Sequence, residues 1–341
     1  MGVYYSNWDV RVEERPVPEI GPGELLLRVE ACGICGSDVM EWYRARKAPL
    51  VLGHEIAGEV AAVGEGVEGF RPGDRVVVAH HVPCNTCRYC LRGHHSVCET
   101  LRSTNLDPGG FAEFARVPRI NVDRGVFPLP EELTYDEGTF VEPLACVLRG
   151  LRMARFQPGQ NLLVVGSGIS GILFIKAARA LGAGQVVAVD IEDYRLKMAR
   201  NMGADAVLPA PEATPERIRS LLGGWLGDLV AVCTGSPRAM EQSFALAERG
   251  GTVLLFAPAP PGTTLSFPAW EIWRDGVSIA TSYAGAPADM ALALDLLRAR
   301  RVEVEDMITH RLSLDEIGKG FALVAQARES LKVIVYPGIK L

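Results

Sequence analysis

Residues 161–190 read NLLVVGSGISGILFIKAARALGAGQVVAVD, and this stretch decides the fold of the second half of the chain. Asn161–Val165 and Gln185–Val189 are short apolar runs typical of buried strands, and the apolar residues of Ile172–Leu181 recur at helical spacing. The GSGISG motif at residues 166–171 stands where the first strand ends and the helix begins. Its glycines permit a tight turn, close backbone approach to a pyrophosphate and close packing of the helix on the strand. The stretch therefore predicts a β-α-β unit that binds a dinucleotide at a helix N-terminus.

Asp190 ends the second strand, nineteen positions after Gly171, where a carboxylate accepts hydrogen bonds from the adenosine ribose. A carboxylate there would repel a 2′-phosphate, so we predict NAD rather than NADP. Arg195 has two interpretations, because it either helps to accommodate such a phosphate or belongs to a solvated helix face. The alternative for the whole motif is an ordinary glycine turn, with Asp190 capping the next helix. The predicted cofactor contacts of this unit are Gly166, Gly168, Ile169, Gly171, Asp190 and Arg195.

The alternation of strands and helices continues beyond this unit. Helix-like Tyr194–Asn201 and Ala239–Ala247 alternate with strand-like Asp228–Cys233 and Thr252–Phe256. Such alternation is typical of a parallel sheet with crossover helices. We therefore predict an α/β, doubly wound domain over residues 145–286.

The first part of the chain is rich in β-structure. Strands are predicted at Glu24–Ala31, Ile56–Val63, Asp74–Val78 and Phe111–Val117, each bounded by glycine or proline. These strands predict a barrel-like lobe over residues 1–144.

The C-terminal segment is predicted to rejoin that lobe. A final strand at Lys332–Val335 needs a sheet partner, and the predicted parallel sheet is already complete without it. Residues 287–341 are therefore expected to return to the first domain.

Four cysteines follow the spacing C-x2-C-x2-C-x7-C in a polar stretch. This spacing lets four thiolates close tetrahedrally around one zinc ion, and such a closed site has no open position for chemistry. We predict a structural zinc ion held by Cys84, Cys87, Cys90 and Cys98.

The composition excludes several classes of partner. Of the 341 residues, 48% are hydrophobic and 22% charged, without an uncharged run long enough to span a bilayer. A net charge of −6 argues against nucleic acid or an anionic membrane as the main partner. Residues 1–9 lack the features of a secretory signal. We expect a cytoplasmic protein with reduced cysteines that acts on a small molecule.

A second group of candidate metal ligands lies outside the four-cysteine stretch. The segments CGICGSD (32–38), GHE (53–55) and VEPLA (141–145) contain thiol, imidazole and carboxylate groups. These are the ligand types of a catalytic zinc site that keeps one position open. Each residue alone is more often part of the core than a ligand, so only the combination predicts a site.

Six segments together carry a resemblance to a known family. GHEIAGEVAAVGEGV (53–67), CGICGSD, the four-cysteine stretch, VEPLA, GSGISG and ITHRL (308–312) resemble the zinc-dependent medium-chain dehydrogenases, in the branch of sorbitol, polyol and threonine dehydrogenases. The similarity extends from Gly21 to Val335. It implies a GroES-like catalytic domain and a Rossmann domain.

The resemblance also implies roles for individual residues. Cys35 rather than Cys32 matches the catalytic zinc ligand, because it directly precedes the Gly-Ser-Asp run. Cys32 is then a small buried residue. Whether Glu55 or Glu142 binds zinc directly is left open. The implied ligands of the catalytic zinc are Cys35, His54, Glu55 and Glu142, and Ser37 completes the predicted catalytic residues.

The expected proton relay departs from the family at one position. Ser37 matches the hydroxyl that passes a proton away from the alcohol, because a hydroxyl both donates and accepts. Many relatives place a histidine five residues after the catalytic cysteine, where this chain has Met40, which carries no proton. Asp38 either supports this loop and a metal-binding imidazole or is a solvated turn residue. His80 and His81 either line the substrate site or are ordinary loop histidines.

Further implications concern the cofactor and the assembly. Lys332 lies where some relatives place a basic residue on the cofactor pyrophosphate, although a lysine at a strand start is usually solvated. Residues 281–283 resemble a stretch beside the nicotinamide and a strand that pairs subunits, which implies a homodimer or homotetramer. Trp270 and Trp273 are expected in the core or at a subunit contact.

The implied activity is hydride transfer between a secondary alcohol or polyol and NAD, with one catalytic and one structural zinc ion per chain. One alternative is L-threonine 3-dehydrogenase, whose substrate carboxylate would need a basic residue such as Arg44, Arg46 or Lys47. Another is a non-catalytic NAD-binding sensor, which has no need of an open zinc position.

Overall fold

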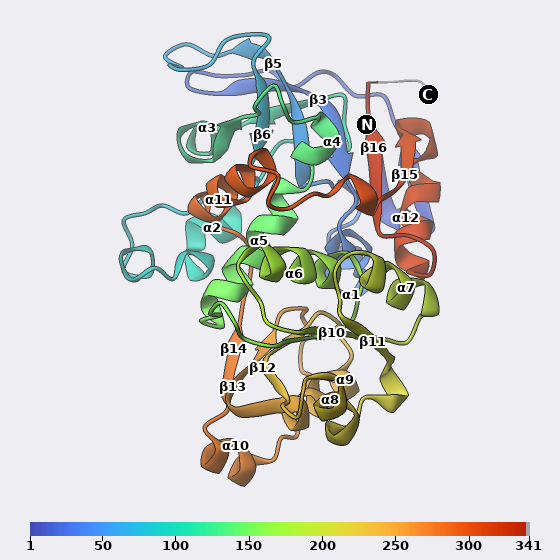
Figure 1. The fold of residues 1–341 in the computed structure, drawn as a ribbon. Helices are drawn as coiled ribbons and strands as arrows, with labels where there is room; N and C mark the ends of the chain where they lie inside the picture. The colour runs from blue at the N-terminus through green and yellow to red at the C-terminus, as the bar shows by residue number, and fades with distance from the viewer. Residues whose placement is uncertain (339–341) are drawn as a thin grey trace. The chain divides into compact units, whose positions relative to one another are not determined.

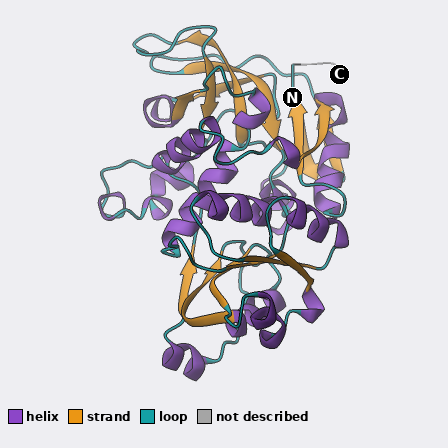
Figure 2. Cartoon of the chain, viewed as in Figure 1, coloured by secondary structure: helices purple, strands orange, loops and turns teal. Residues whose placement is uncertain are grey.

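The computed structural model describes residues 1–338. The chain folds into two compact units. Unit 1 combines Met1–Ala145 with the segment from Ala284 onward, and unit 2 is Cys146–Tyr283. Figure 1 and Figure 2 show the two units, the first with sheets of mainly antiparallel strands and the second with a parallel sheet between helices. No helix among residues 1–338 is long and apolar enough to cross a membrane.

Unit 1 is built on a seven-stranded sheet in the order β15-β16-β3-β5-β6-β8, with β7 paired to β3. The C-terminal strand β16 pairs antiparallel with β3, with Val335 opposite Cys32, so the last segment completes the sheet of the first domain. The strands are β3 (Leu25–Gly33), β5 (Glu55–Val63), β6 (Arg75–Val78), β7 (Phe114–Val117), β8 (Val126–Pro128), β15 (Ile308–Ser313) and β16 (Lys332–Tyr336).

Smaller elements surround this sheet. A three-stranded sheet formed by β1 (Gly2–Ser6), β2 (Asp9–Val12) and β4 (Leu50–Val51) was not predicted, because its strands are short and lack a clear alternation. The helices of unit 1 are α1 (Glu41–Arg44), α2 (Glu99–Ser103), α3 (Arg119–Gly125), α4 (Tyr135–Gly138), α11 (Pro287–Arg298) and α12 (Ile317–Gln326).

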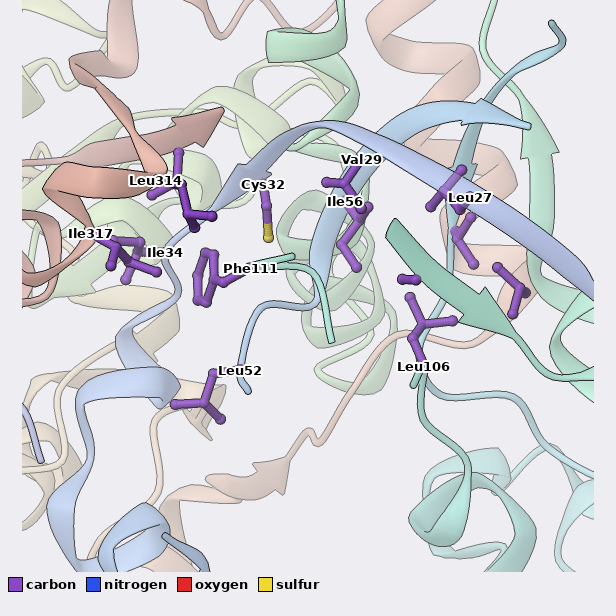
Figure 3. Packing of buried hydrophobic residues seen from close by; sticks show 14 of the residues in the cluster. Leu27, Val29, Cys32, Ile34, Leu52, Ile56, Leu106, Phe111, Leu314 and Ile317 are labelled. Carbon is purple, nitrogen blue, oxygen red and sulfur yellow. The ribbon is translucent and has the colours of Figure 1, made fainter. Parts of the chain in front are cut away.

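The core of unit 1 joins segments from both ends of the chain. Figure 3 shows the Cys32 sulfur above the Phe111 ring, between apolar side chains of β3, β5 and the segment before α12. Cys32 is fully buried, which confirms its interpretation as a small core residue. Phe321 of α12 meets Phe111 edge-on, with ring centroids 5.6 Å apart. An aromatic pair of this kind contributes about 0.5–1.5 kcal/mol beyond the burial of its area.

Unit 2 confirms the predicted doubly wound domain. Its six strands are all parallel, in the order β11-β10-β9-β12-β13-β14, and Figure 1 shows α6 and α7 on one face of the sheet and α8 and α9 on the other. The strands are β9 (Leu162–Val165), β10 (Val186–Asp190), β11 (Ala206–Pro209), β12 (Gly227–Val232), β13 (Ala247–Leu255) and β14 (Ser278–Thr281). The helices are α6 (Ile169–Ala180), α7 (Asp193–Asn201), α8 (Pro215–Leu221), α9 (Pro237–Ser243) and α10 (Ala269–Asp275), and α5 (Val141–Met153) spans the boundary between the units.

One predicted helix is too long. Ala239–Ala247 was expected to be helical throughout, but α9 ends at Ser243, a short 3-10 turn follows, and Ala247 begins β13. The alternation of small and apolar residues in this stretch fits both periods, and pairing of Ala247 with Gly227 in the sheet decides for the strand.

Candidate metal centres and cofactor loop

The four predicted cysteine ligands converge as their spacing indicates. All four sulfur atoms lie within 4.8 Å of one another, and adjacent Sγ–Sγ distances are 3.5 Å for Cys87–Cys90, 3.6 Å for Cys84–Cys98 and 4.0 Å for Cys84–Cys90. A tetrahedron with zinc–sulfur bonds of about 2.3 Å has edges of about 3.8 Å. The geometry therefore matches a closed, structural zinc site.

The local fold prepares these thiols for a cation. Cys84 accepts a hydrogen bond from the backbone N–H of Cys87 at 3.2 Å, and hydrogen bonds from Thr86 lower the pKa of Cys84 to about 5. Asn85 adopts a left-handed conformation (φ 63°), which asparagine tolerates better than most residues. This turn allows the cysteine side chains on either side of Asn85 to point toward the same metal position.

Cys35 stands at the start of a short 3-10 turn, Gly36–Val39, that follows β3. Its Sγ accepts the backbone N–H of Ser37 at 3.4 Å, and its own N–H donates to the Asp38 carboxylate at 3.1 Å. This capping arrangement holds the loop from both ends. The thiol is left partly exposed at the turn.

Asp38 lies behind the imidazole of His54. It is fully buried, and its Oδ1 is 3.4 Å from His54 Nδ1, so the interpretation of Asp38 as a solvated turn residue is wrong. Burial lowers the pKa of His54, but the Asp38 carboxylate and then the Cys35 thiolate outweigh it and raise that pKa well above its usual value. A carboxylate on Nδ1 leaves Nε2 as the nitrogen for a metal.

A glycine fixes the entry of the chain to His54. Gly53 has φ +95°, and a Cβ atom there would lie 2.8 Å from both the Cys32 sulfur and the Phe111 backbone nitrogen. Only glycine adopts this conformation in this space without displacing the core. Gly53 is therefore required both for the packing of the core next to the site and for the path of the chain into His54.

Glu55 is held by Lys332. Both side chains are buried, and Lys332 Nζ donates to Glu55 Oε2 at 2.5 Å and to the Thr139 carbonyl at 3.4 Å. The ammonium also lies 4.7 Å from the centre of the Phe140 ring. The expectation that a lysine at a strand start is solvated is therefore wrong here, whereas its contact with a cofactor pyrophosphate stays a prediction.

The four predicted catalytic ligands all belong to unit 1. Glu142 lies in the first turn of α5, within the part of that helix assigned to unit 1. Among residues 1–338, the four cysteines form the only group of three or more His, Cys, Asp or Glu side chains gathered at metal-binding distances. Cys35 and His54 are hydrogen-bonded to each other, and a thiol and an imidazole are ligand types of open zinc sites. Glu55 is instead paired with Lys332. Thiol and imidazole thus fit a zinc ion, and the third ligand stays a prediction.

Arg44 contacts the predicted relay hydroxyl, which sequence patterns did not indicate. Its Nε donates to the Ser37 carbonyl at 2.9 Å and its Nη2 to Ser37 Oγ at 3.2 Å, with Asp38 Oδ1 at 3.5 Å. These contacts commit the guanidinium to the loop, which argues against Arg44 as a site for a substrate carboxylate. This contact is visible only in three dimensions, because Arg44 lies outside the CGICGSD motif that contains Ser37.

His80 and His81 adjoin His54 within unit 1. The rings of His54 and His80 have centroids 4.8 Å apart, and those of His80 and His81 are 3.9 Å apart. Burial, followed by the neighbouring His81 and His54, holds the pKa of His80 well below its usual value. Burial also lowers the pKa of His81 to about 4. Both rings are therefore neutral at neutral pH, and whether they line the substrate site stays a prediction.

The glycine loop of unit 2 has the geometry that its motif predicts. Gly166 has φ +95°, Gly168 caps α6, and a Cβ at Gly171 would press on the backbone carbonyl of Gly166. The helix N-terminus follows the loop directly and leaves backbone N–H groups for an anion.

Asp190 organises this loop as well as ending β10. Its Oδ2 accepts the backbone N–H of Ser167 at 2.6 Å, and its Oδ1 accepts those of Ile191 and Glu192 at 2.8 and 3.0 Å. Asp190 therefore holds the turn whether or not it also contacts a ribose, which stays a prediction.

Arg195 reaches back from α7 to the glycine loop. Its guanidinium carbon would lie 3.7 Å from a Cβ at Gly168, and its Nη1 is 4.0 Å from Asp190 Oδ2. Its Nε is buried and unpaired among the described residues, and only 21% of the side chain is exposed. The interpretation as a solvated helix face is therefore wrong, while a role toward a phosphate stays a prediction.

Two family models match the chain. Residues 21–131 match the alcohol dehydrogenase GroES-like domain, and residues 170–299 match the zinc-binding dehydrogenase domain. The first match covers Cys35, His54 and the four cysteines of unit 1, and the second begins inside the glycine loop of unit 2.

Individual relatives match almost the full length. Sorbitol dehydrogenase of Gallus gallus is 30% identical over 344 aligned positions, covering 98% of this chain and 95% of the relative. A crystal structure from Sinorhizobium meliloti 1021, described as a zinc-binding dehydrogenase bound to NADP, is 30% identical, covers 98% of both chains and has a TM-score of 0.87. The 2R,3R-butanediol dehydrogenase of Bacillus subtilis is 26% identical, covers 99% of both chains and has a TM-score of 0.86. On this agreement of fold, site and sequence, the chain belongs to the medium-chain, zinc-binding alcohol dehydrogenase family.

Proposed function

We propose that this chain oxidises a secondary alcohol or polyol with NAD, using one catalytic and one structural zinc ion. The observation that carries the proposal is the Cys35–His54 pair with Asp38 behind the imidazole, because this is the arrangement of an open metal site. The neighbouring Ser37 hydroxyl and the glycine loop of unit 2 supply the two other parts that an alcohol dehydrogenase needs.

The chain's residues divide the work as follows. A bound zinc ion supplies Lewis-acid chemistry, which lowers the pKa of an alcohol. Ser37 accepts the alcohol proton as it passes its own hydroxyl proton on, and Arg44, whose Nη2 donates to Ser37 Oγ at 3.2 Å, keeps the hydroxyl in place. Because Met40 replaces the relay histidine, the proton leaves Ser37 through the cofactor ribose and water or through a carboxylate. The glycine loop and Asp190 hold the cofactor.

Two carboxylates compete for the third ligand position. Ligation by Glu55 has to break or share its ion pair with Lys332. Zinc content of Glu142→Gln and Glu55→Gln proteins separates the two, since the direct ligand's variant loses about one zinc per chain.

A panel of alcohols tests the proposal. Purified, zinc-loaded protein is assayed for NAD reduction with sorbitol, butane-2,3-diol, butan-2-ol and L-threonine. We expect reduction with a polyol or secondary alcohol, and loss of it in Cys35→Ser protein that keeps its fold and NAD binding. Activity confined to L-threonine, or full activity after complete removal of zinc, would overturn the proposal. NAD binding without oxidation of any alcohol would favour the sensor alternative.

The assembly is part of the proposal. We infer a homodimer or homotetramer, supported by the open edge of β14 and by the exposed aromatic side chains beside it. This inference is tested separately below.

A further inference from the structure

Unit 2 contains a pocket that is separate from the residues assigned above to zinc or cofactor. Its volume is about 840 Å³, within the range of about 300–1,000 Å³ that is typical of small-molecule sites. All of its lining residues belong to unit 2, so one compact unit forms the pocket by itself. The charged, amide and aromatic side chains that line it are Asn161, Arg219, Trp225, Asp228, Glu248 and Arg249.

This pocket, called the amino-edge pocket below, lies at the end of the sheet opposite to the glycine loop. The six strands of unit 2 are parallel, so their amino ends share one edge of the sheet and their carboxyl ends share the other. Asn161 directly precedes β9, whereas Gly166 of the glycine loop directly follows it. Asp228 and Glu248 are the second residues of β12 and β13. Dinucleotides bind outside the carboxyl ends of such strands, so this pocket is not the predicted cofactor site.

The two carboxylates of the pocket are engaged inside the protein. Asp228 Oδ2 accepts the backbone N–H of Asn161 at 2.7 Å. Glu248 Oε2 accepts the backbone N–H of Leu226 at 2.8 Å and pairs with Arg219 Nη1 at 3.3 Å. Only 12% of the Glu248 side chain is exposed. These contacts tie both carboxylates to the wall of the pocket, and the pair of Glu248 and Arg219 adds no net charge to it.

Arg249 is the cation of the pocket that stays available to a ligand. Its side chain is 79% exposed, and its Nε lies 3.9 Å from Asp275 Oδ1, beyond hydrogen-bonding distance. Asp275 instead accepts two hydrogen bonds from the neighbouring Arg274, at 2.9 and 3.1 Å. A guanidinium binds a carboxylate or a phosphate through two parallel N–H donors. Arg249 therefore offers a site for either anion.

Trp225 adds an exposed aromatic face on a fixed backbone. The residue is 61% exposed, while its N–H donates to the Leu222 carbonyl at 3.2 Å and the following residue, Leu226, is buried. A single exposed apolar residue is common on protein surfaces, so Trp225 alone indicates no site. In the same pocket as an available guanidinium, however, the indole offers a stacking surface for a planar ring.

We propose that the amino-edge pocket binds a small molecule that carries both a planar aromatic ring and an anionic group. The ring stacks on Trp225, and the anion pairs with Arg249. Nucleoside monophosphates and aromatic carboxylates share this chemistry, and the pocket has the volume for either. The inference goes beyond the proposed function, because no step of alcohol oxidation uses the residues of this pocket.

Calorimetric titration of the full chain tests the proposal, with NAD present at saturation to occupy the glycine loop. Adenosine monophosphate and indole-3-acetate are the two ring-bearing anions, and they distinguish a phosphate ligand from a carboxylate ligand. Adenosine and indole-3-acetamide lack the anion, whereas ribose 5-phosphate and acetate lack the ring. We expect at least one ring-bearing anion to bind, and its two matched analogues to bind at least about tenfold more weakly.

Substitutions in the pocket locate the binding. Arg249→Gln and Trp225→Ala should each weaken binding of the ring-bearing anion at least about tenfold, whereas Trp225→Phe should keep most of the affinity because it retains an aromatic face. Arg217→Gln is the matched control, at an exposed arginine of α8 that does not line the pocket, and it should bind as wild type does. Circular dichroism and thermal unfolding check the fold of each variant.

Three results would each overturn the inference. The first is that neither ring-bearing anion binds to the wild-type protein, and the second is that the matched analogues bind as tightly as the ring-bearing anion. The third is wild-type affinity in Arg249→Gln or in Trp225→Ala, which would place the bound molecule elsewhere. These titrations measure no alcohol oxidation, so a failure of the proposed function would leave their outcome unchanged.

Discussion

At the scale of single residues, the buried ion pair of Lys332 and Glu55 is expected to contribute to stability. Removing one partner of a buried ion pair leaves an uncompensated charge, at a cost of about 3–5 kcal/mol. We predict that Lys332→Met lowers the free energy of unfolding by that order, measured by urea denaturation. Lys319→Met is the control, because its pair with Glu316 is exposed and such pairs contribute about 0–1 kcal/mol. Equal midpoints for the two variants would mean that the Lys332 pair contributes little.

Asp190 carries a second prediction at this scale, on cofactor choice. Asp190→Gly removes the charge that would repel a 2′-phosphate and also the acceptor of three backbone N–H groups. We expect a higher KM for both cofactors and a fall of about tenfold or more in the ratio of kcat/KM for NAD to that for NADP, equivalent to about 1.4 kcal/mol. Asp193→Asn, which removes the same charge at the exposed start of α7, should not change the ratio. An unaltered ratio in Asp190→Gly would restrict Asp190 to holding the loop.

At the scale of elements, the four-cysteine loop and the turn after β3 should respond differently to loss of a ligand. Cys98→Ser opens the closed site, so the protein should lose one zinc per chain together with thermal stability or assembly, because structural zinc contributes directly to folding. Cys35→Ser should lose turnover while the melting temperature and NAD binding change little. Elemental analysis with thermal unfolding checks both. Similar behaviour of the two variants would contradict separate structural and catalytic roles.

The elements also differ in how far the sequence predicts them. The β-α-β unit at 161–190 follows from its glycines and apolar runs, and β9, α6 and β10 lie within a few residues of the predicted ranges. The strands β1, β2 and β4 were missed, because two to five residues without alternation carry too weak a pattern. The overextended helix at Ala239–Ala247 failed for a different reason, since pairing in the sheet overrides local periodicity.

At the scale of the whole molecule, the candidate site depends on contacts between distant segments. The types and spacing of Cys35 and His54 indicate their chemistry from sequence. The ion pair of Glu55 and Lys332 cannot be predicted from sequence, because 277 positions separate the two residues. The pairing of β16 with β3 brings them together in the fold. The burial of His80 Nδ1 without a hydrogen-bond partner among residues 1–338 is equally invisible in sequence, because it depends on how the folded chain surrounds that ring.

The assembly gives the last prediction at this scale. In the described residues β14 pairs only with β13, so its outer edge is open for another strand. Trp273 and Ile279 are 73% and 43% exposed. The expectation that the tryptophans of α10 lie in the core is therefore wrong. The other expectation, that they form a subunit contact, stays a prediction. Open, apolar strand edges are normally covered, because they otherwise pair without control.

We therefore predict that light scattering after size exclusion gives a multiple of the chain mass of 36.8 kDa. The double variant Trp273→Lys/Ile279→Lys should run as a single chain, because it places one lysine on the open edge strand β14 and another on the adjacent helix α10, where both oppose pairing. Leu91→Lys, at an exposed leucine of the four-cysteine loop, is the matched control and should keep the wild-type mass. A wild-type protein of one chain mass would rule out the assembly, and a double variant of unchanged mass would place the contact on another surface.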